Sequence, residues 1–222
     1  MYRQHFFFCM INDKKTEKLA AIYDLLYDVY GECECPLVHS SNFELLCAVI
    51  LSAQCTDKRV NIITPALFAE FGTPEKMAAA SFDEVFELIK TAGLAKSKTQ
   101  SLISMAQTLV KDFNSEVPST MDELLTLAGV GRKTANVMLS NAFNKPGFPV
   151  DTHVRRMLVK LGLSRSDDPL KLEIMVNRRM AGEKLGNFSH LLIFHGRAVC
   201  HAQSPECGKC VLKNICKTGK KQ

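Results

Sequence analysis

The chain has 222 residues, 46% of them apolar, enough for one sizeable domain or two smaller ones. Its net charge of +5 is mildly basic, which is compatible with a polyanionic partner but does not demand one. The opening MYRQHFFFCM has too short an apolar run for a secretory signal or a membrane span. With an odd number of cysteines, nine, we expect an intracellular protein, cytoplasmic or at the nucleoid if bacterial, whose thiols are free or bind metal.

Almost every segment carries apolar residues at helical period, and no useful alternating pattern is present. The sequence therefore predicts an all-α fold with about ten helices. The expected helices cover residues 13–30, 43–52, 56–72, 82–93, 98–113, 120–129, 132–142, 152–162, 169–180 and 185–199.

Two patterns support these boundaries. In the first helix one apolar stripe is expected, made of Leu19, Ile22, Leu25, Leu26 and Val29. Side chains that can cap helix starts precede several of the others, namely Asn42, Thr56, Ser81 (with Glu84 in a capping box), Thr120, Asp151 and Asp168.

The segment LLTLAGVGRKTAN joins two predicted helices through Gly129, Val130 and Gly131. The glycines permit positive φ and close approach of the backbone to an outside group, while Val130 would anchor the turn in the core. The following helix starts at once, and its amide groups can bind phosphate. The glycines alone support two interpretations equally: an ordinary connection between helices, and a contact to a DNA backbone.

Lys133 and Asp151 each have two interpretations. Lys133 lies in the first turn of a helix, whose positive end disfavours an ammonium and favours a neutral, nucleophilic amine. The plainer interpretation is a solvated lysine that touches phosphate. Asp151 directly precedes a helix and is expected to be its N-cap, and spacing does not show whether it also faces Lys133.

Four cysteines lie close together near the C-terminus: Cys200, Cys207, Cys210 and Cys216. Their C-x6-C-x2-C-x5-C spacing has one close pair rather than the two pairs common in structural zinc sites. We therefore expect a [4Fe–4S] cluster ahead of zinc, and disulfides least. Of the others, Cys47 is expected in the core, and no partner is evident for Cys9, Cys33, Cys35 and Cys55.

Together these segments resemble the endonuclease III family of base-excision DNA glycosylases, within the helix-hairpin-helix superfamily. The resemblance rests on LSAQCTD (51–57), LAGVGRKTANV (127–137), FPVDTHVRR (148–156), HGRAVC (195–200) and the cysteine run. It implies a six-helix barrel domain over 35–145, with its helix-hairpin-helix at about 124–142. It also implies an iron–sulfur cluster domain made of 1–34 plus 146–222, with a DNA cleft between the two. Ala128 stands where the family commonly has proline.

The resemblance also implies roles for residues. Lys133 would form a Schiff base with the sugar of a damaged pyrimidine nucleotide, and Asp151 would assist its deprotonation and stabilise positive charge on the sugar. Gln54 would fill the space left by the flipped nucleotide, and Leu94 would wedge into the opposing strand.

Other groups would hold the DNA backbone. They are the hairpin residues Gly129, Val130, Gly131 and Arg132, together with Lys213 beside the four cluster-binding cysteines. The partner would be double-stranded DNA with damaged pyrimidines or abasic sites, bound by a monomer away from membranes. Two alternatives remain: a mismatch-specific monofunctional glycosylase of the same superfamily, and a non-enzymatic DNA-binding module.

Overall fold

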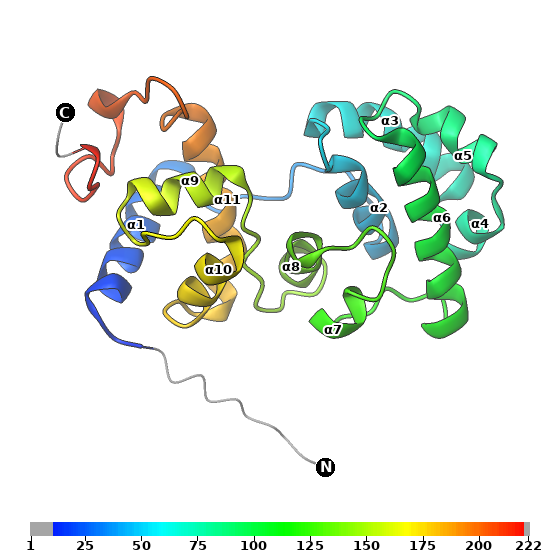
Figure 1. Ribbon diagram of the computed structural model, residues 1–222, viewed down its shortest axis with the longest axis horizontal. Coiled ribbons are helices and arrows are strands. Elements are labelled where there is room, and N and C mark those ends of the chain that lie inside the picture. The colour runs from blue at the N-terminus through cyan, green and yellow to red at the C-terminus, as the bar shows by residue number, and fades with distance from the viewer. Residues whose placement is uncertain (1–10, 220–222) are drawn as a thin grey trace, which may run out of the picture. The chain divides into compact units, whose positions relative to one another are not determined.

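The computed structural model describes residues 11–219, and these are helical with no strand among them (Figure 1). The all-α prediction is therefore confirmed. The α-helices are α1 (Lys14–Tyr30), α2 (Asn42–Ser52), α3 (Asp57–Phe71), α4 (Pro74–Ala79), α5 (Phe82–Ile89), α6 (Ala95–Asp112), α7 (Met121–Leu124), α8 (Arg132–Asn141), α9 (Thr152–Lys160), α10 (Pro169–Asn177) and α11 (Gly182–Ala198). A short 3-10 helix, η1 (Cys207–Lys209), follows them. None of these described helices is long and apolar enough to cross a membrane.

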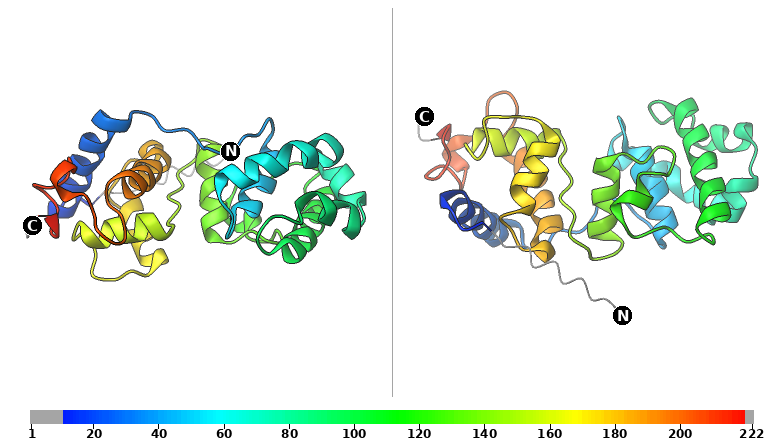
Figure 2. Two further views of the ribbon diagram at one scale, coloured as in Figure 1. Left: turned by 90° about the horizontal axis from the view of Figure 1, so that it is seen from above. Right: turned by 60° about the horizontal axis from the view of Figure 1, so that its bottom comes forward.

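The described chain divides into two compact units. One, the central unit, is the continuous segment Cys35–Lys145. The other, the terminal unit, combines residues 11–34 with residues 146–219. The chain therefore passes from one unit to the other twice, and the helices of each unit can be followed in Figure 2.

The central unit is built around α2. Its sequence NFELLCAVILS is apolar nearly all round, as a helix enclosed by others requires, and every residue from Leu45 to Leu51 is buried. Cys47 is among them, as predicted. Helix α2 packs against α3 and α8, while α4 and α5 pack against α6.

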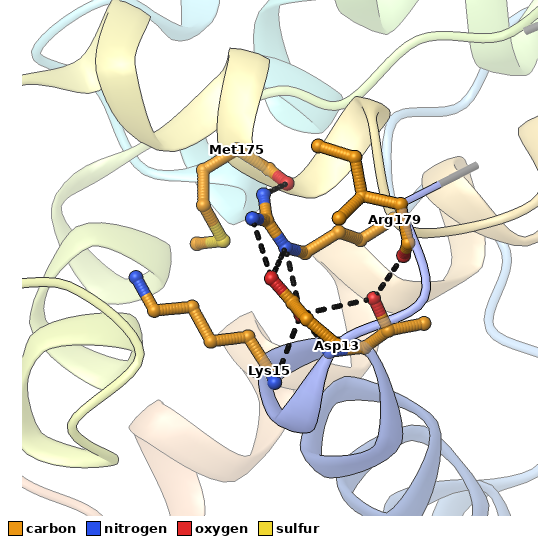
Figure 3. Close-up of polar contacts among 6 residues, drawn as sticks. Asp13, Lys15, Met175 and Arg179 are labelled. Atoms are coloured by element: carbon orange, nitrogen blue, oxygen red, sulfur yellow. Dashed lines mark hydrogen bonds and ion pairs between the residues drawn. The ribbon is translucent and has the colours of Figure 1, made fainter. Parts of the chain in front are cut away.

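The terminal unit is built around α11, which packs against α1 and α9. Phe148 and Phe188 form its largest fully buried pair, with ring centroids 5.8 Å apart. Asp13 joins the two distant segments of this unit, as Figure 3 shows. Its carboxylate caps α1 by accepting from the amides of Lys15 and Thr16, and the Arg179 guanidinium donates to it at 2.9 Å. The pKa of Asp13 is held well below its usual range, mainly by the hydrogen bond from Arg179.

The structure corrects four details of the predicted helices. Ser41, not Asn42, caps α2, because its hydroxyl accepts from the amide of Glu44 at 3.1 Å. Helix α4 was not predicted, although Thr73 caps it and Pro74 occupies its first position. Val29 is 51% exposed because the apolar stripe of α1 leaves the core in its last turn. Helix α5 ends at Ile89, before the glycine expected to stop it.

Candidate DNA-binding and catalytic sites

The predicted hairpin is present in the central unit, between α7 and α8. Val130 is buried, with 8% of its surface exposed, and packs in the core of the unit. Its amide donates to the carbonyl of Leu127 at 3.1 Å, which closes the turn. The expectation that Val130 anchors the hairpin is therefore confirmed.

The two glycines of the hairpin serve different needs. Gly129 has φ of 78°, and a Cβ there would lie 2.9 Å from the Cβ of Ser101. Gly131 has φ of −96°, so of the two glycines only Gly129 uses the left-handed region that glycine permits. A Cβ on Gly131 would meet nothing within 4 Å. Both glycines are exposed, but a side chain at Gly129 would collide with Ser101, whereas one at Gly131 would point into open space.

Helix α8 starts directly after this open position. Its N-cap is Gly131, and no side chain caps it. Gly131, Arg132 and Lys133 are all exposed there, so charged groups stand on a helix end that favours anions. Lys133 is also close enough to influence Cys35. Burial raises the pKa of that thiol, and the charge of Lys133 partly opposes the rise.

Gln54 and Leu94 lie on two loops of the central unit that touch. Both residues have left-handed backbones, with φ of 51° and 61°, a conformation that costs a non-glycine residue roughly 1–2 kcal/mol. A Cβ on Gly93 would lie 2.6 Å from the carbonyl oxygen of Gln54, so only glycine allows this approach. Leu94 is 56% exposed and caps α6 without a side-chain hydrogen bond. Two strained loops therefore present a polar and an apolar side chain from one region.

Sequence reasoning missed the residue beneath these loops, Lys98. It is 4% exposed, and its ammonium donates to the carbonyl of Leu51 at 2.7 Å, at the negative C-terminal end of α2. Burial lowers the pKa of Lys98, and the nearby Cys55 opposes that shift. Its place was readable, because positions 98, 102, 105 and 109 share one buried face of α6.

Asp151 caps α9 in the terminal unit, as predicted, and its carboxylate accepts from the amide of Val154 at 2.8 Å. The residue is half-buried. Next to it, burial lowers the pKa of His153, and the charge of Asp151 opposes this. Lys133 belongs to the central unit, and its pairing with Asp151 stays a prediction.

The four C-terminal cysteines line one pocket, together with Lys160, Val199, Pro205, Glu206, Lys213, Thr218 and Gly219. None of the eight cysteines between residues 11 and 219 forms a disulfide, and Cys9 lies outside that range. Within the same range no three His, Cys, Asp or Glu side chains are gathered tightly enough for a single metal ion. The four thiols therefore line one pocket without being gathered around a single metal-ion position.

Neighbouring groups hold two of the four sulfurs. The Nε2 atom of His195 lies 3.2 Å from the sulfur of Cys210, and the amide of Gly219 donates to the sulfur of Cys216 at 3.4 Å. Donors of this kind stabilise sulfur that carries negative charge.

The first of the four cysteines is held through its backbone. The Arg156 guanidinium donates to the carbonyl of Cys200 at 3.0 Å.

The lysines beside this pocket differ in what they touch. Lys213 and Lys217 are exposed. Lys209 forms a 2.6 Å ion pair with Glu206, which raises the pKa of its ammonium. Lys213 is therefore accessible, and its contact with DNA phosphate stays a prediction, while Lys209 is paired with Glu206.

Comparison with known proteins identifies the family. Residues 47–180 match the model of the HhH-GPD superfamily base excision DNA repair proteins. The chain is 42% identical to Endonuclease III of Bacillus subtilis (strain 168) over 96% of each protein. Its structure also resembles a non-covalent Endonuclease III–DNA complex (TM-score 0.88, 39% identity, covering 96% of this chain and 98% of that one). A trapped covalent Endonuclease III–DNA intermediate matches equally well (TM-score 0.88, 39% identity, 96% and 99% covered). At this identity over nearly the full length of both proteins, this chain belongs to the endonuclease III family.

Proposed function

We propose that this protein is a bifunctional DNA glycosylase and AP lyase of base excision repair. It removes oxidised pyrimidines from double-stranded DNA and cuts the strand 3′ to the abasic site. The observation that carries the proposal is the exposed Lys133 in the uncapped first turn of α8, beside the hairpin. A relative 39% identical to this chain has been trapped in a covalent complex with DNA, which is what an attacking lysine would produce.

The reaction starts with a nucleotide turned out of the duplex, because a stacked base is out of reach. The Lys133 amine attacks C1′ of the sugar, the bond to the damaged base breaks, and the base leaves with a proton. The covalent intermediate opens to a Schiff base. Loss of the proton on C2′ then expels the 3′ phosphate by β-elimination, and water releases the enzyme.

Asp151 supports this chemistry as a carboxylate. It takes the proton that the Lys133 ammonium must lose before attack, and it stabilises positive charge that develops on the sugar. The N-cap bond to Val154 occupies one oxygen at 2.8 Å and holds the carboxylate in place. The proposal requires Lys133 and Asp151 to face the same extruded nucleotide.

The remaining residues of the central unit hold the distorted duplex. Gln54 fills the vacated space and Leu94 enters the opposing strand, which agrees with the strained loops that carry them. Gly131 and Arg132 contact the phosphate backbone at the start of α8, where the open space at Gly131 supports close approach.

A [4Fe–4S] cluster fits the cysteine pocket, because four thiols line one space and two of them have hydrogen-bond partners. Cys200, Cys207, Cys210 and Cys216 would hold it as thiolates. When bound, the cluster organises a segment with little core of its own, and Lys213 on that segment contacts DNA phosphate. The protein acts on chromosomal DNA, and we place it at the nucleoid as a monomer.

Borohydride trapping on duplex DNA with an abasic site tests the proposal. The wild-type protein is expected to form a covalent adduct, and Lys133→Ala is expected to form none. Lys111→Ala, which changes an exposed lysine in the last turn of α6, is the matched control and should trap normally. A second duplex that carries an oxidised pyrimidine measures base release. Base release without trapping by the wild type would favour a monofunctional glycosylase, and absence of both activities would favour a non-enzymatic DNA-binding module.

A further inference from the structure

A chain of polar contacts runs through the terminal unit to one of the four cysteines. His195, on α11, is 1% exposed. Its Nε2 atom lies 3.2 Å from the sulfur of Cys210, and its Nδ1 atom lies 3.0 Å from the hydroxyl of Tyr30. Tyr30 is the last residue of α1, and its ring meets the imidazole edge-on, with centroids 5.9 Å apart. The imidazole of His195 therefore connects Tyr30, at the end of α1, with Cys210, which lies 180 residues later in the sequence.

The positions of the protons in the contacts among Tyr30, His195 and Cys210 can be assigned by elimination. A neutral imidazole carries a proton on one nitrogen and a lone pair on the other. A cysteine that binds metal is a thiolate, which accepts hydrogen bonds and has no proton to donate. With Cys210 as a ligand, Nε2 must therefore be the donor and Nδ1 the acceptor. The hydroxyl of Tyr30 is the group that donates to Nδ1.

The hydroxyl of Tyr30 therefore does more than fill space, because it selects the tautomer that places an N–H on the sulfur. Without it, the imidazole could carry its proton on Nδ1 and turn a lone pair toward a negatively charged sulfur. Since His195 is buried, that misplaced lone pair could not be solvated freely. Hydrogen bonds to ligand sulfurs are among the factors that set the potential of iron–sulfur clusters.

We propose that Tyr30 and His195 are positioning residues that hold an imidazole N–H on the sulfur of Cys210 and thereby raise the reduction potential of the cluster. The N–H withdraws electron density from the sulfur, so it stabilises the form of the cluster that carries one more electron. The inference rests on the cluster proposed above. It assigns a role to the end of α1, which lies outside the hairpin and the loops proposed to contact DNA.

The test compares two tyrosines on the same helix. Tyr30→Phe removes the hydroxyl and keeps the ring, while Tyr27→Phe does the same at a position that is 41% exposed. The midpoint potential of each iron-loaded protein is measured at one pH by protein-film voltammetry, in which the electrode supplies or accepts the electron. Tyr30→Phe is expected to lower the equilibrium constant for reduction about tenfold, a shift of about 59 mV. Tyr27→Phe should match the wild type.

A rescue variant separates positioning from simple packing. In His195→Gln the carboxamide nitrogen can donate to the sulfur without any choice of tautomer. In the His195→Gln background, Tyr30→Phe should therefore leave the potential unchanged, and iron should stay bound. If Tyr30→Phe alone releases iron, the double variant should retain it, whereas a purely structural hydroxyl predicts loss in both.

The outcomes distinguish this inference from the proposed function. Wild-type protein that holds no iron and shows no visible iron–sulfur absorbance would overturn the cluster itself. Iron-loaded Tyr30→Phe with the potential of the wild type, or an equal shift in Tyr27→Phe, would overturn the role of the hydroxyl while trapping by Lys133 still stands.

Discussion

The two hairpin glycines offer a sharp test, because the same methyl group added at each should have opposite effects. At Gly129 the methyl enters the protein, 2.9 Å from the Cβ of Ser101 and 3.4 Å from the side chain of Ile50. At Gly131 it enters open space at the start of α8. Gly129→Ala should therefore damage the fold, and Gly131→Ala should damage contact with DNA.

The magnitudes follow from the backbone and the contacts. At φ of 78°, alanine in place of Gly129 costs roughly 1–2 kcal/mol from the backbone. Crowding against Ser101 adds about 1–3 kcal/mol, so a loss of roughly 2–5 kcal/mol is expected. Gly131 has an extended backbone, and the entropy gain of about 0.4–1 kcal/mol offsets the weaker capping by alanine. Its stability should change by less than about 1 kcal/mol.

For DNA affinity the order of the two variants should be reversed, with the larger loss in Gly131→Ala. A methyl group at Gly131 would hold a phosphate away from the amides of α8. Loss of one hydrogen bond to a charged group costs roughly 1.5–3 kcal/mol, so affinity should fall about tenfold or more. The measurements are the urea midpoint by circular dichroism and fluorescence anisotropy with a duplex that carries an abasic-site analogue, at one fixed salt concentration.

Two results would contradict this reasoning. Equal destabilisation by both alanines would mean that Gly131 also faces the core. Unchanged affinity of Gly131→Ala at full stability would mean that the DNA backbone does not approach this end of α8.

Three further predictions concern strain and charge. Leu94→Gly should raise stability by about 1 kcal/mol, since glycine tolerates the left-handed backbone, yet it should lower repair activity; a parallel loss of both would contradict the wedge role. Asp13→Asn keeps an N-cap but loses the pair with Arg179. Because the folded-state pKa of Asp13 is lowered, its stabilisation is present above the usual carboxyl range and disappears in acid. The variant should thus melt lower at neutral pH and match the wild type in strong acid. Burial lowers the pKa of Lys98 in the folded state, so the unfolded chain binds the proton more tightly. The stability of the wild type relative to Lys98→Met should therefore rise as the pH rises toward the usual lysine pKa. If the two proteins differ in urea midpoint by the same amount at neutral and at alkaline pH, this reasoning is wrong.

Local chemistry accounts for most of what could be predicted. Capping at Thr56, Ser81, Asp151 and Asp168 joins residues three positions apart, so these contacts could be read from the order of the sequence. At α2 two neighbouring residues, Ser41 and Asn42, are both able to cap a helix. Local sequence does not decide between them, and in the structure Ser41 is the N-cap.

The long-range contacts could not be predicted in the same way. Lys98 contacts Leu51, 47 residues away, and Tyr30 contacts His195, 165 residues away. No spacing rule joins such pairs, because tertiary packing brings them together. No spacing rule joins Lys133 and Asp151 either, and their shared role stays a proposal based on the family and on their chemistry.

One unit is continuous in sequence and the other is made of two distant segments, which affects the order in which they can fold during synthesis. The central unit is one continuous stretch, so it can fold while the rest is still being synthesised. Helix α1, made first, must wait for α11 and for Arg179, 166 residues after Asp13. Until then the apolar face of α1 stays exposed, and exposed apolar surface of this kind favours aggregation or chaperone binding. The proposed cluster would then be assembled late, once Cys216, the last of its four cysteines along the chain, has left the ribosome.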